Sequence, residues 1–267
     1  MDTGLVLSGG GARGIAHIGA IKALEEYGIC PSHIAGTSAG AIVGALYAGG
    51  CPWQEILDFF KTVEIFSINK YARKKPGFVD TAKFYDLLVK YLPSDSFEDL
   101  EKPLYVTATN LLDGSLKVFY RGELIKPLLA SASVPGIFAP IQIESGYFID
   151  GGTLNNFPVD LIKMYCDKII GIYVNPFEKV KIEDLKHSYN VMERAYHIMV
   201  AKDTFNKFKD CDVLIRPERM GDFGMFSLKK VDILFELGYA AAKKVLQSRE
   251  GDKKFNVSKL EFELNKQ

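Results

Sequence analysis

Short apolar runs alternate along the chain with longer segments of helical periodicity, and this alternation most constrains the fold. Residues 5–7 form the first run, which is followed by a glycine-rich turn and by apolar residues at helical spacing that end near Gly28. A second short run ends near Thr37. Strands that alternate with helices build crossover units and a largely parallel sheet. The pattern therefore predicts an α/β fold.

Further strands are expected at residues 104–109, 116–120, 147–149, 168–174 and 213–215, and a further helix at 81–91. Two apolar stripes at helical spacing predict two helices nearer the C-terminus. The first comprises Met192, Ala195, Tyr196 and Met199, and the second comprises Val231, Leu234, Phe235, Ala241, Ala242 and Val245. We interpret both stripes as faces turned toward the core. The chain has no repeat of fixed period and no Pro/Gly/Ser-rich linker, so we expect one domain over residues 1–267.

Composition excludes several classes of protein. The 267 residues are 48% hydrophobic and carry 33 basic and 33 acidic side chains, which argues against a nucleic-acid partner. The four cysteines lie far apart without a CxxC pair, so we expect free thiols and no metal site. No basic-then-apolar signal segment and no apolar run of membrane-spanning length is present, which predicts a cytoplasmic protein whose lipid contact is peripheral.

Residues 36–40, with the sequence GTSAG, match the GxSxG pattern. In this pattern Gly36 and Gly40 allow Ser38 to sit on a sharp turn between a strand and a helix, with its hydroxyl exposed as a nucleophile. The context agrees, because an apolar strand precedes the motif and an Ala-rich helix follows it. The alternative is a purely structural turn.

Residues 9–14, with the sequence GGGARG, also follow a predicted strand and open a helix. The GxGxxG spacing is compatible with a dinucleotide site, but such a site needs an acidic residue about twenty positions later, and none occurs between Glu26 and Glu55. Without side chains, Gly9, Gly10 and Gly11 can direct N–H groups at an oxyanion beside Ser38. Arg13 is expected to support this loop or to add positive potential, and Gly14 completes the motif.

A third motif, Asp150-Gly151-Gly152, follows the predicted strand at 147–149. An Asp-Gly pair is often only a turn. Sites in parallel α/β sheets assemble at the carboxyl ends of strands, however, and the other two motifs also lie at predicted strand ends. Asp150 is therefore a candidate base for Ser38.

Together these motifs resemble those of the patatin-like phospholipase family of lipid acyl hydrolases. The stretches 9–14, 36–40 and 150–152 are similar to the family's oxyanion loop, nucleophile elbow and aspartate motif, in the family's order. Residues 131–140 and 155–158 also fit, so the resemblance covers about residues 3–175. It implies a three-layer α/β/α fold, a Ser38–Asp150 dyad without histidine, an acyl-enzyme on Ser38, a fatty-acyl ester of a lipid as substrate and no cofactor.

Three alternatives stay open at this stage. A Ser-His-Asp triad would use His187 or His197, which follow Asp150 in the chain. An oxidoreductase would bind a nucleotide on residues 9–14, and a noncatalytic scaffold would have kept the fold without the reaction.

The irregular segment 52–100 is a candidate cap over the site. Its aromatic side chains lie among basic ones, which suggests a lipid-binding surface or else ordinary core aromatics beside a solvated charge run. The aromatic and aliphatic residues concerned are Phe59, Phe60, Ile65, Phe66 and Tyr71, and the basic ones are Lys70, Arg73, Lys74 and Lys75.

Overall fold

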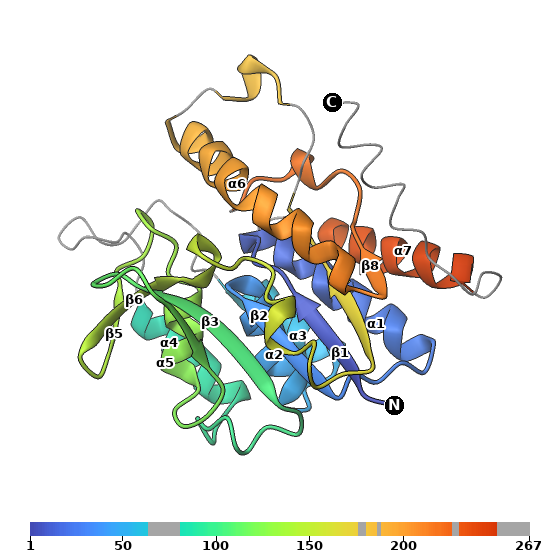
Figure 1. The fold of residues 1–267 in the computed structure, drawn as a ribbon, viewed down its shortest axis with the longest axis horizontal. Coiled ribbons are helices and arrows are strands. Elements are labelled where there is room, and N and C mark those ends of the chain that lie inside the picture. Colours follow the sequence, from blue (N-terminus) through green and yellow to red (C-terminus); the bar gives the residue numbers. More distant parts are fainter. Residues whose placement is uncertain (64–80, 176–179, 186–187, 226–229, 250–267) are drawn as a thin grey trace.

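The computed structural model describes residues 1–63, 81–175, 180–185, 188–225 and 230–249. Its centre is an eight-stranded sheet in the order β5-β6-β3-β2-β1-β7-β8, with β4 paired to β3 (Figure 1). The strands are β1 (Thr3–Leu7), β2 (His33–Thr37), β3 (Leu104–Asn110), β4 (Leu116–Phe119), β5 (Ile141–Ile143), β6 (Gly146–Asp150), β7 (Lys168–Ile172) and β8 (Val213–Ile215). The strands β1, β2, β3, β7 and β8 are parallel, whereas the pairs β3–β4, β3–β6 and β5–β6 are antiparallel. The sheet is mixed and mostly parallel, and β5 is the strand that the sequence analysis did not predict.

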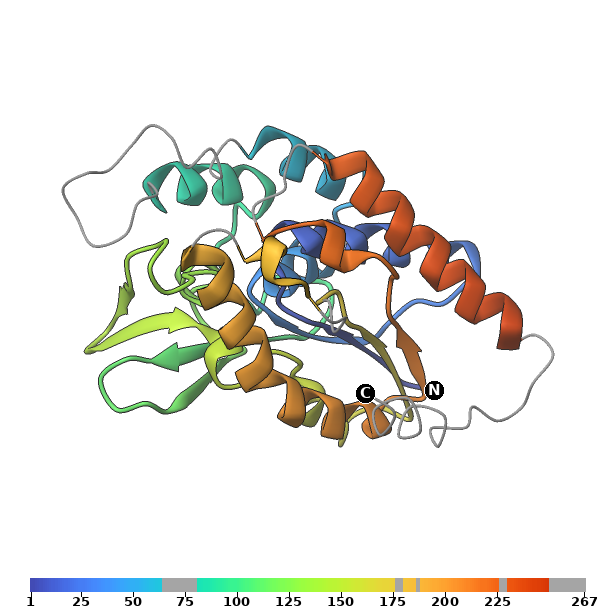
Figure 2. The ribbon, with the colours of Figure 1, turned by 90° about the horizontal axis from the view of Figure 1, so that it is seen from above.

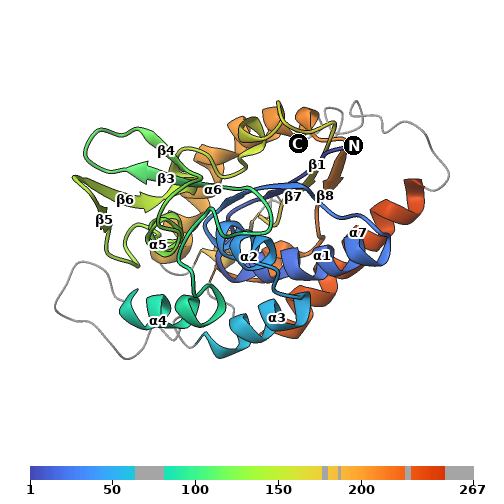
Figure 3. The same ribbon diagram turned by 90° about the horizontal axis from the view of Figure 1, so that it is seen from below.

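Helices cover both faces of this sheet. They are α1 (Ile15–Glu26), α2 (Ala39–Ala48), α3 (Trp53–Thr62), α4 (Thr81–Tyr91), α5 (Ile125–Ser131), α6 (Ser188–Lys207) and α7 (Val231–Arg249). Figures 2 and 3 show α3, α4 and α7 on one side of the molecule and α6 on the other. The three-layer α/β/α fold is therefore confirmed. Among the described residues, no helix is both long and apolar enough to cross a bilayer.

Alternating side chains of β1 show how the sheet joins the two layers. Leu5 and Leu7 pack into the large core beneath the helices, and Val6 packs on the opposite face with Phe157 and Phe208. Successive side chains of a strand point to opposite faces, so a run that is apolar throughout is buried on both. This explains why residues 5–7 are continuously hydrophobic.

The strands β2 and β6 lie end to end along one edge of β3. Thr37, the last residue of β2, pairs with Thr107, and Asp150, the last residue of β6, pairs with Ala108. The other edge of β3 is occupied by β4 at residues 106–109, so β2 and β6 must share the remaining edge. Their carboxyl ends therefore point toward each other.

This register corrects one step of the sequence analysis. We expected Asp150 to reach the site because the carboxyl ends of parallel strands meet at one edge of a sheet. In the structure β6 is antiparallel to β3, and Asp150 arrives from the opposite direction to Ser38. The residue was correctly placed at a strand end, but the physical reason was wrong.

The two apolar stripes predicted to face the core lie in α6 and α7, and only the stripe in α7 does so. In α7, Val231, Leu234, Phe235 and Ala242 are buried, with Ala241 and Val245 packed partly against the core, as predicted. In α6 the expected core face is wrong for three of its four residues, because Met192 is 61% exposed, Met199 is 77% exposed and Ala195 is exposed as well, whereas Tyr196 is half-buried with its hydroxyl close to Gly152. The buried side of α6 instead carries His197, Ala201 and Thr204.

Candidate active site

Ser38 lies on a strained turn between β2 and α2. Its φ of 55° and ψ of −126° are values that glycine adopts readily and other residues rarely do. The flanking glycines are needed for contact rather than for conformation. A Cβ at Gly40 would collide with the carbonyl oxygens of Leu7 and Ser8, and one at Gly36 would lie 2.6 Å from the carbonyl oxygen of Gly40. The elbow predicted for residues 36–40 is therefore present as a tightly packed turn.

The hydroxyl of Ser38 is hydrogen bonded to the carboxylate of Asp150. Asp150 is only 3% exposed, and its Oδ1 also accepts a hydrogen bond of 2.7 Å from the backbone N–H of Gly152. Burial raises the pKa of Asp150 to about 6, against the opposing effect of these two hydrogen bonds. At neutral pH the carboxylate is thus ionised, yet it is a stronger base than an aspartate in water.

Gly151 and Gly152 hold Asp150 close to neighbouring groups. A Cβ at Gly151 would collide with Thr107, and one at Gly152 would collide with the hydroxyl of Tyr196. Thr107 in turn shares a 2.7 Å hydrogen bond with Thr37, the residue before Ser38. The aspartate motif therefore packs on β3, and β3 is hydrogen bonded in turn to the last residue of β2, which leads to the serine.

The glycine loop lies beside Ser38. A Cβ placed at Gly9 would be 3.2 Å from the Cβ of Ser38, and one at Gly14 would be 2.6 Å from the Cβ of Ala39. The N–H of Gly9 donates to the carbonyl oxygen of Asn156 (3.2 Å). Gly10 and Gly11, which has a φ of 58°, stand at the start of a short 3-10 helix, where N–H groups have no intrahelical acceptor.

Arg13 does not point toward the serine but holds the glycine loop to the C-terminal half of the chain. Its side chain is 2% exposed and forms a 3.1 Å ion pair with Glu193 of α6. The guanidinium also donates to the carbonyl oxygen of Phe223 (3.1 Å) and to Oδ1 of Asn175 (3.2 Å), and lies 3.0 Å from Nε2 of His197. Of the two roles expected for Arg13, the structure shows loop support.

The histidines in the described part of the chain are His17, His33 and His197, and His187 lies outside it. None of these three rings, within that part, is hydrogen bonded to Ser38 or Asp150. His17 lies 2.8 Å from the carbonyl oxygen of Ser8. Burial is the main cause that lowers the pKa of His17 to about 4 and that of His197 to about 3, with Arg13 contributing to the latter. Both rings are therefore neutral structural groups at pH 7.

The site includes three polar groups that the motif analysis did not single out. Ser131 accepts a 2.8 Å hydrogen bond at Oγ from the N–H of Ser38. The Oδ1 of Asn156 lies close to Gly9 and Gly152, and its Nδ2 is buried without a hydrogen-bond partner among the described residues. Burial raises the pKa of Tyr196, and the charge of Asp150 adds to this effect. The only available signal for Ser131 and Asn156 was their place in the stretches 131–140 and 155–158.

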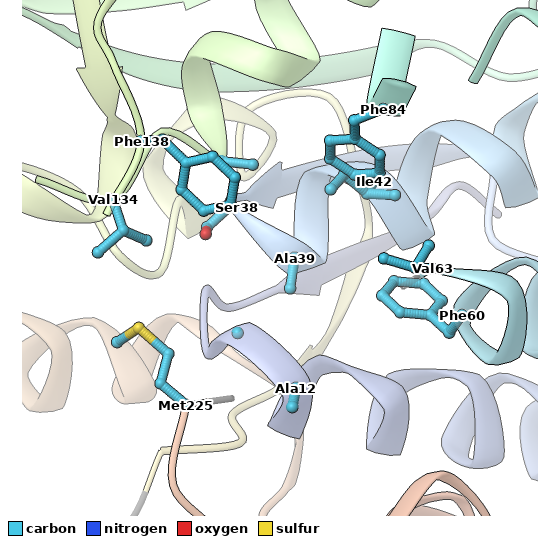
Figure 4. Close-up of a pocket in the computed structure, with 12 residues that line it drawn as sticks. Ala12, Ser38, Ala39, Ile42, Phe60, Val63, Phe84, Val134, Phe138 and Met225 are labelled. Atoms are coloured by element: carbon cyan, nitrogen blue, oxygen red, sulfur yellow. The ribbon is translucent and has the colours of Figure 1, made fainter. Parts of the chain in front are cut away.

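A narrow apolar pocket opens beside Ser38, with a volume of about 20 Å³. Figure 4 shows the hydroxyl of Ser38 as the one oxygen among the side chains drawn. The pocket is lined by Gly11, Ala12, Ser38, Ala39, Ile42, Phe60, Val63, Phe84, Ala132, Val134, Phe138 and Met225. Phe60 lies near the end of α3, Val63 follows that helix directly, and Phe84 belongs to α4. The described part of the predicted cap, residues 52–100, thus contributes to the wall of the pocket.

Phe59 and Phe60, the first two residues of the predicted lipid-binding surface, do not lie at the surface. Phe59 is fully buried and Phe60 is 4% exposed, so both belong to the core, as the alternative interpretation required. Ile65, Phe66 and Tyr71, with the four basic residues at 70–75, lie outside the described residues.

The sequence matches one family model and is similar to several known proteins. The model of the patatin-like phospholipase family matches residues 5–162. A lysophospholipase NTE1 from Mycosarcoma maydis is 27% identical over 95% of this chain and 15% of its own length. An uncharacterised NTE family protein from Mycobacterium tuberculosis is 34% identical over 65% of this chain and 49% of its own. The chain thus spans half or less of these two relatives.

A solved structure has a similar fold. The crystal structure of the type III effector protein ExoU superposes with a TM-score of 0.53 and 17% identity, over 94% of this chain and 54% of that one. At this level of identity the likeness concerns the fold alone.

Proposed function

Because the chain belongs to the patatin-like phospholipase family, we propose that it is a serine acyl hydrolase that cleaves fatty-acyl esters of lipids through Ser38 and Asp150. The observation that carries this proposal is the hydrogen bond between the Ser38 hydroxyl and a buried aspartate whose pKa burial raises to about 6. A serine hydroxyl is a weak nucleophile unless a base takes its proton. Asp150 is the group in reach of that proton.

In the first step the Oγ of Ser38 attacks the acyl carbonyl carbon, and its proton passes to the carboxylate of Asp150. The tetrahedral intermediate then collapses, and the leaving alcohol takes the proton from Asp150. This leaves an acyl group esterified to Ser38. In the second half, water attacks the ester carbonyl and gives a proton to Asp150. The second tetrahedral intermediate then collapses with cleavage of the bond to Ser38, Asp150 returns the proton to the Ser38 oxygen, and the free acid leaves.

Negative charge on the intermediate needs hydrogen-bond donors. The N–H groups of Gly10 and Gly11 are the best candidates in the glycine loop, because those of Gly9 and Ala12 already donate to the carbonyl oxygens of Asn156 and Met225. Loss of one such donor typically lowers the rate by about 10²–10³. Gly9 and Gly14 have a second role, which is to let the loop pack against Ser38 and α2.

Specific observations argue against the alternatives. His197 is bound to Arg13, which leaves a histidine-dependent triad without support in the described residues. Ser38 occupies the end of β2, where a dinucleotide site would place a carboxylate for the ribose. The scaffold hypothesis does not explain why Ser38 keeps a strained conformation next to a buried base.

The size of the pocket indicates what an acyl chain must displace, and the name of one relative indicates which substrates to test first. A volume of about 20 Å³ admits about one water molecule, so an acyl chain must displace aromatic side chains such as Phe60, Phe84 and Phe138. The Mycosarcoma maydis relative is named a lysophospholipase. We therefore propose monoacyl phospholipids as the first substrates to test, with peripheral contact between protein and membrane during turnover.

The proposal is tested by fluorophosphonate labelling and by hydrolysis of a panel of diacyl, monoacyl and neutral lipids. Wild type should be labelled and active, and Ser38→Ala should lose both properties. Ser133→Ala is the matched control, because Ser133 is equally buried but its hydroxyl donates to the carbonyl oxygen of Leu129 (2.7 Å). Labelling of folded Ser38→Ala at the wild-type level, or its undiminished turnover, would refute the proposed nucleophile.

A further inference from the structure

The helix α6 has its apolar side turned to solvent. Val191 is 50% exposed, Met192 61%, Ile198 59% and Met199 77%. With the exposed Ala195 between them, these residues are spaced as one helical stripe. We call these five residues the α6 apolar face. Contiguous exposed apolar patches on soluble proteins usually mark an interaction site.

This orientation is held from the inside by polar groups. On the opposite side of the helix Glu193 forms the ion pair with Arg13, and His197 lies 3.0 Å from the same guanidinium. The Arg13 side chain is 2% exposed, and a buried charge that loses its partners is strongly destabilising. The apolar face is therefore directed outward by a specific buried contact.

The α6 apolar face adjoins the pocket of the proposed nucleophile. The Cε of Met192 lies 4.0 Å from the position that a Cβ would take at Gly136. Gly136 stands between Val134 and Phe138, both of which line the pocket beside Ser38. Figures 1 and 2 show α6 outermost on its side of the sheet. A surface applied to this face would thus meet the rim of the pocket.

We propose that the α6 apolar face docks on the surface of a lipid bilayer and brings the pocket to its substrate. The choice of a lipid rests on the proposed function, because a water-insoluble acyl ester must pass from an aggregate to Ser38. An amphipathic helix that presents Met, Ile and Val can bury them at the boundary between headgroups and acyl chains. Methionine suits such a contact, since its flexible side chain adapts to irregular apolar surroundings.

The test is cosedimentation with phosphatidylcholine vesicles, which carry no net charge and so isolate apolar binding. Met192→Gln, Ile198→Gln and Met199→Gln are combined in one variant, whose substitutions are all at exposed positions. We expect its vesicle partition coefficient to fall at least about tenfold, because each apolar side chain that enters the lipid adds to partitioning. The matched control is Met164→Gln, since Met164 is 88% exposed and precedes Tyr165, which stacks on His33 at the opposite end of β2 from Ser38.

Two further measurements separate the outcomes. All binding is repeated in a Ser38→Ala background, so that vesicle binding is measured whether or not the proposed reaction occurs. Turnover of a soluble short-chain ester should be equal in the triple variant and wild type. The inference is overturned if wild type does not sediment with vesicles, or if the triple variant binds them as wild type does. It is also overturned if sedimentation velocity shows a dimer that the triple variant abolishes, since the face would then bind a second copy of the chain.

Discussion

Replacement of Asp150 by asparagine should stabilise the protein at neutral and alkaline pH while it abolishes hydrolysis. Burial raises the pKa of Asp150 from 3.8 to about 6 in the folded chain. Each pKa unit corresponds to about 1.4 kcal/mol, so the ionised carboxylate lowers the free energy of unfolding by about 3 kcal/mol. Asparagine keeps the shape and an acceptor oxygen for Gly152 but carries no charge.

The stability of wild type depends on pH because Asp150 binds its proton more tightly in the folded chain than in the unfolded chain. Between about pH 4 and pH 6 the folded chain holds a proton on Asp150 that the unfolded chain has lost, so the stability of wild type falls as pH rises through this range. Asp150→Asn lacks this effect. The two proteins should therefore differ little below pH 4, and the variant should be more stable by about 3 kcal/mol above pH 7.

Urea unfolding of both proteins at several pH values from 4 to 8 measures this difference. Asp99→Asn serves as the control, because Asp99 is exposed. Its free energy of unfolding should show no comparable increase above pH 7. Hydrolysis by wild type should increase with pH through about pH 6, because the carboxylate form accepts the proton. If Asp150→Asn is less stable than wild type at pH 8, or gains equally at pH 4 and pH 8, the reasoning about a desolvated base is wrong.

Three other predictions concern the groups around the dyad. Ser38→Gly should unfold with a free energy about 1 kcal/mol higher than Ser38→Ala, because glycine adopts the φ of 55° without strain; equal urea midpoints would show that the elbow is unstrained. Arg13→Met should lower the free energy of unfolding by about 3–5 kcal/mol, since it removes the guanidinium from Glu193, whose side chain is only 10% exposed, and from the buried Asn175 and His197. A loss under about 1 kcal/mol in the same assay would contradict this. The variants His17→Gln and His197→Gln should keep kcat within about tenfold of wild type when corrected for the folded fraction, and a loss as large as that of Ser38→Ala would point to a histidine mechanism.

The elements nearest to the site could be predicted because their signals are local. Residues 9–14 and 36–40 each follow an apolar strand and precede a helix, and this local pattern is visible in the sequence. The contacts that exclude a side chain at their glycines are mostly with distant segments, such as Asn156 and Met225 for the first turn and Leu7 for the second, and these the sequence does not show. The roles of these turns depend on backbone conformation, which glycine and its neighbours largely determine. The elbow at Ser38 was therefore predictable without knowledge of the rest of the chain.

The approach of Asp150 to Ser38 could not be derived in the same way. It depends on β6 pairing antiparallel with β3 and occupying the edge that β2 leaves free beyond Thr37. Strand direction and register are set by pairing across the sheet. The sequence of residues 146–150 alone does not show which strand they pair with or in which direction. Its place at a strand end and the resemblance to the family both indicate Asp150, but the parallel pairing assumed for its strand is incorrect.

The orientation of α6 also could not be predicted from the local sequence, because it depends on a single side chain far away in the chain. Helical periodicity shows which residues share a face, but not whether that face is turned inward. Here the decision depends on Arg13, which lies 180 positions before its partner Glu193. Turning α6 over would bury Met192 and Met199 but would remove Glu193 and His197 from the guanidinium, and breaking a buried ion pair costs about 3–5 kcal/mol. The same contact that fixes the glycine loop beside Ser38 therefore also fixes the outward direction of the α6 apolar face, so that Arg13→Met should perturb the loop and the proposed lipid contact together.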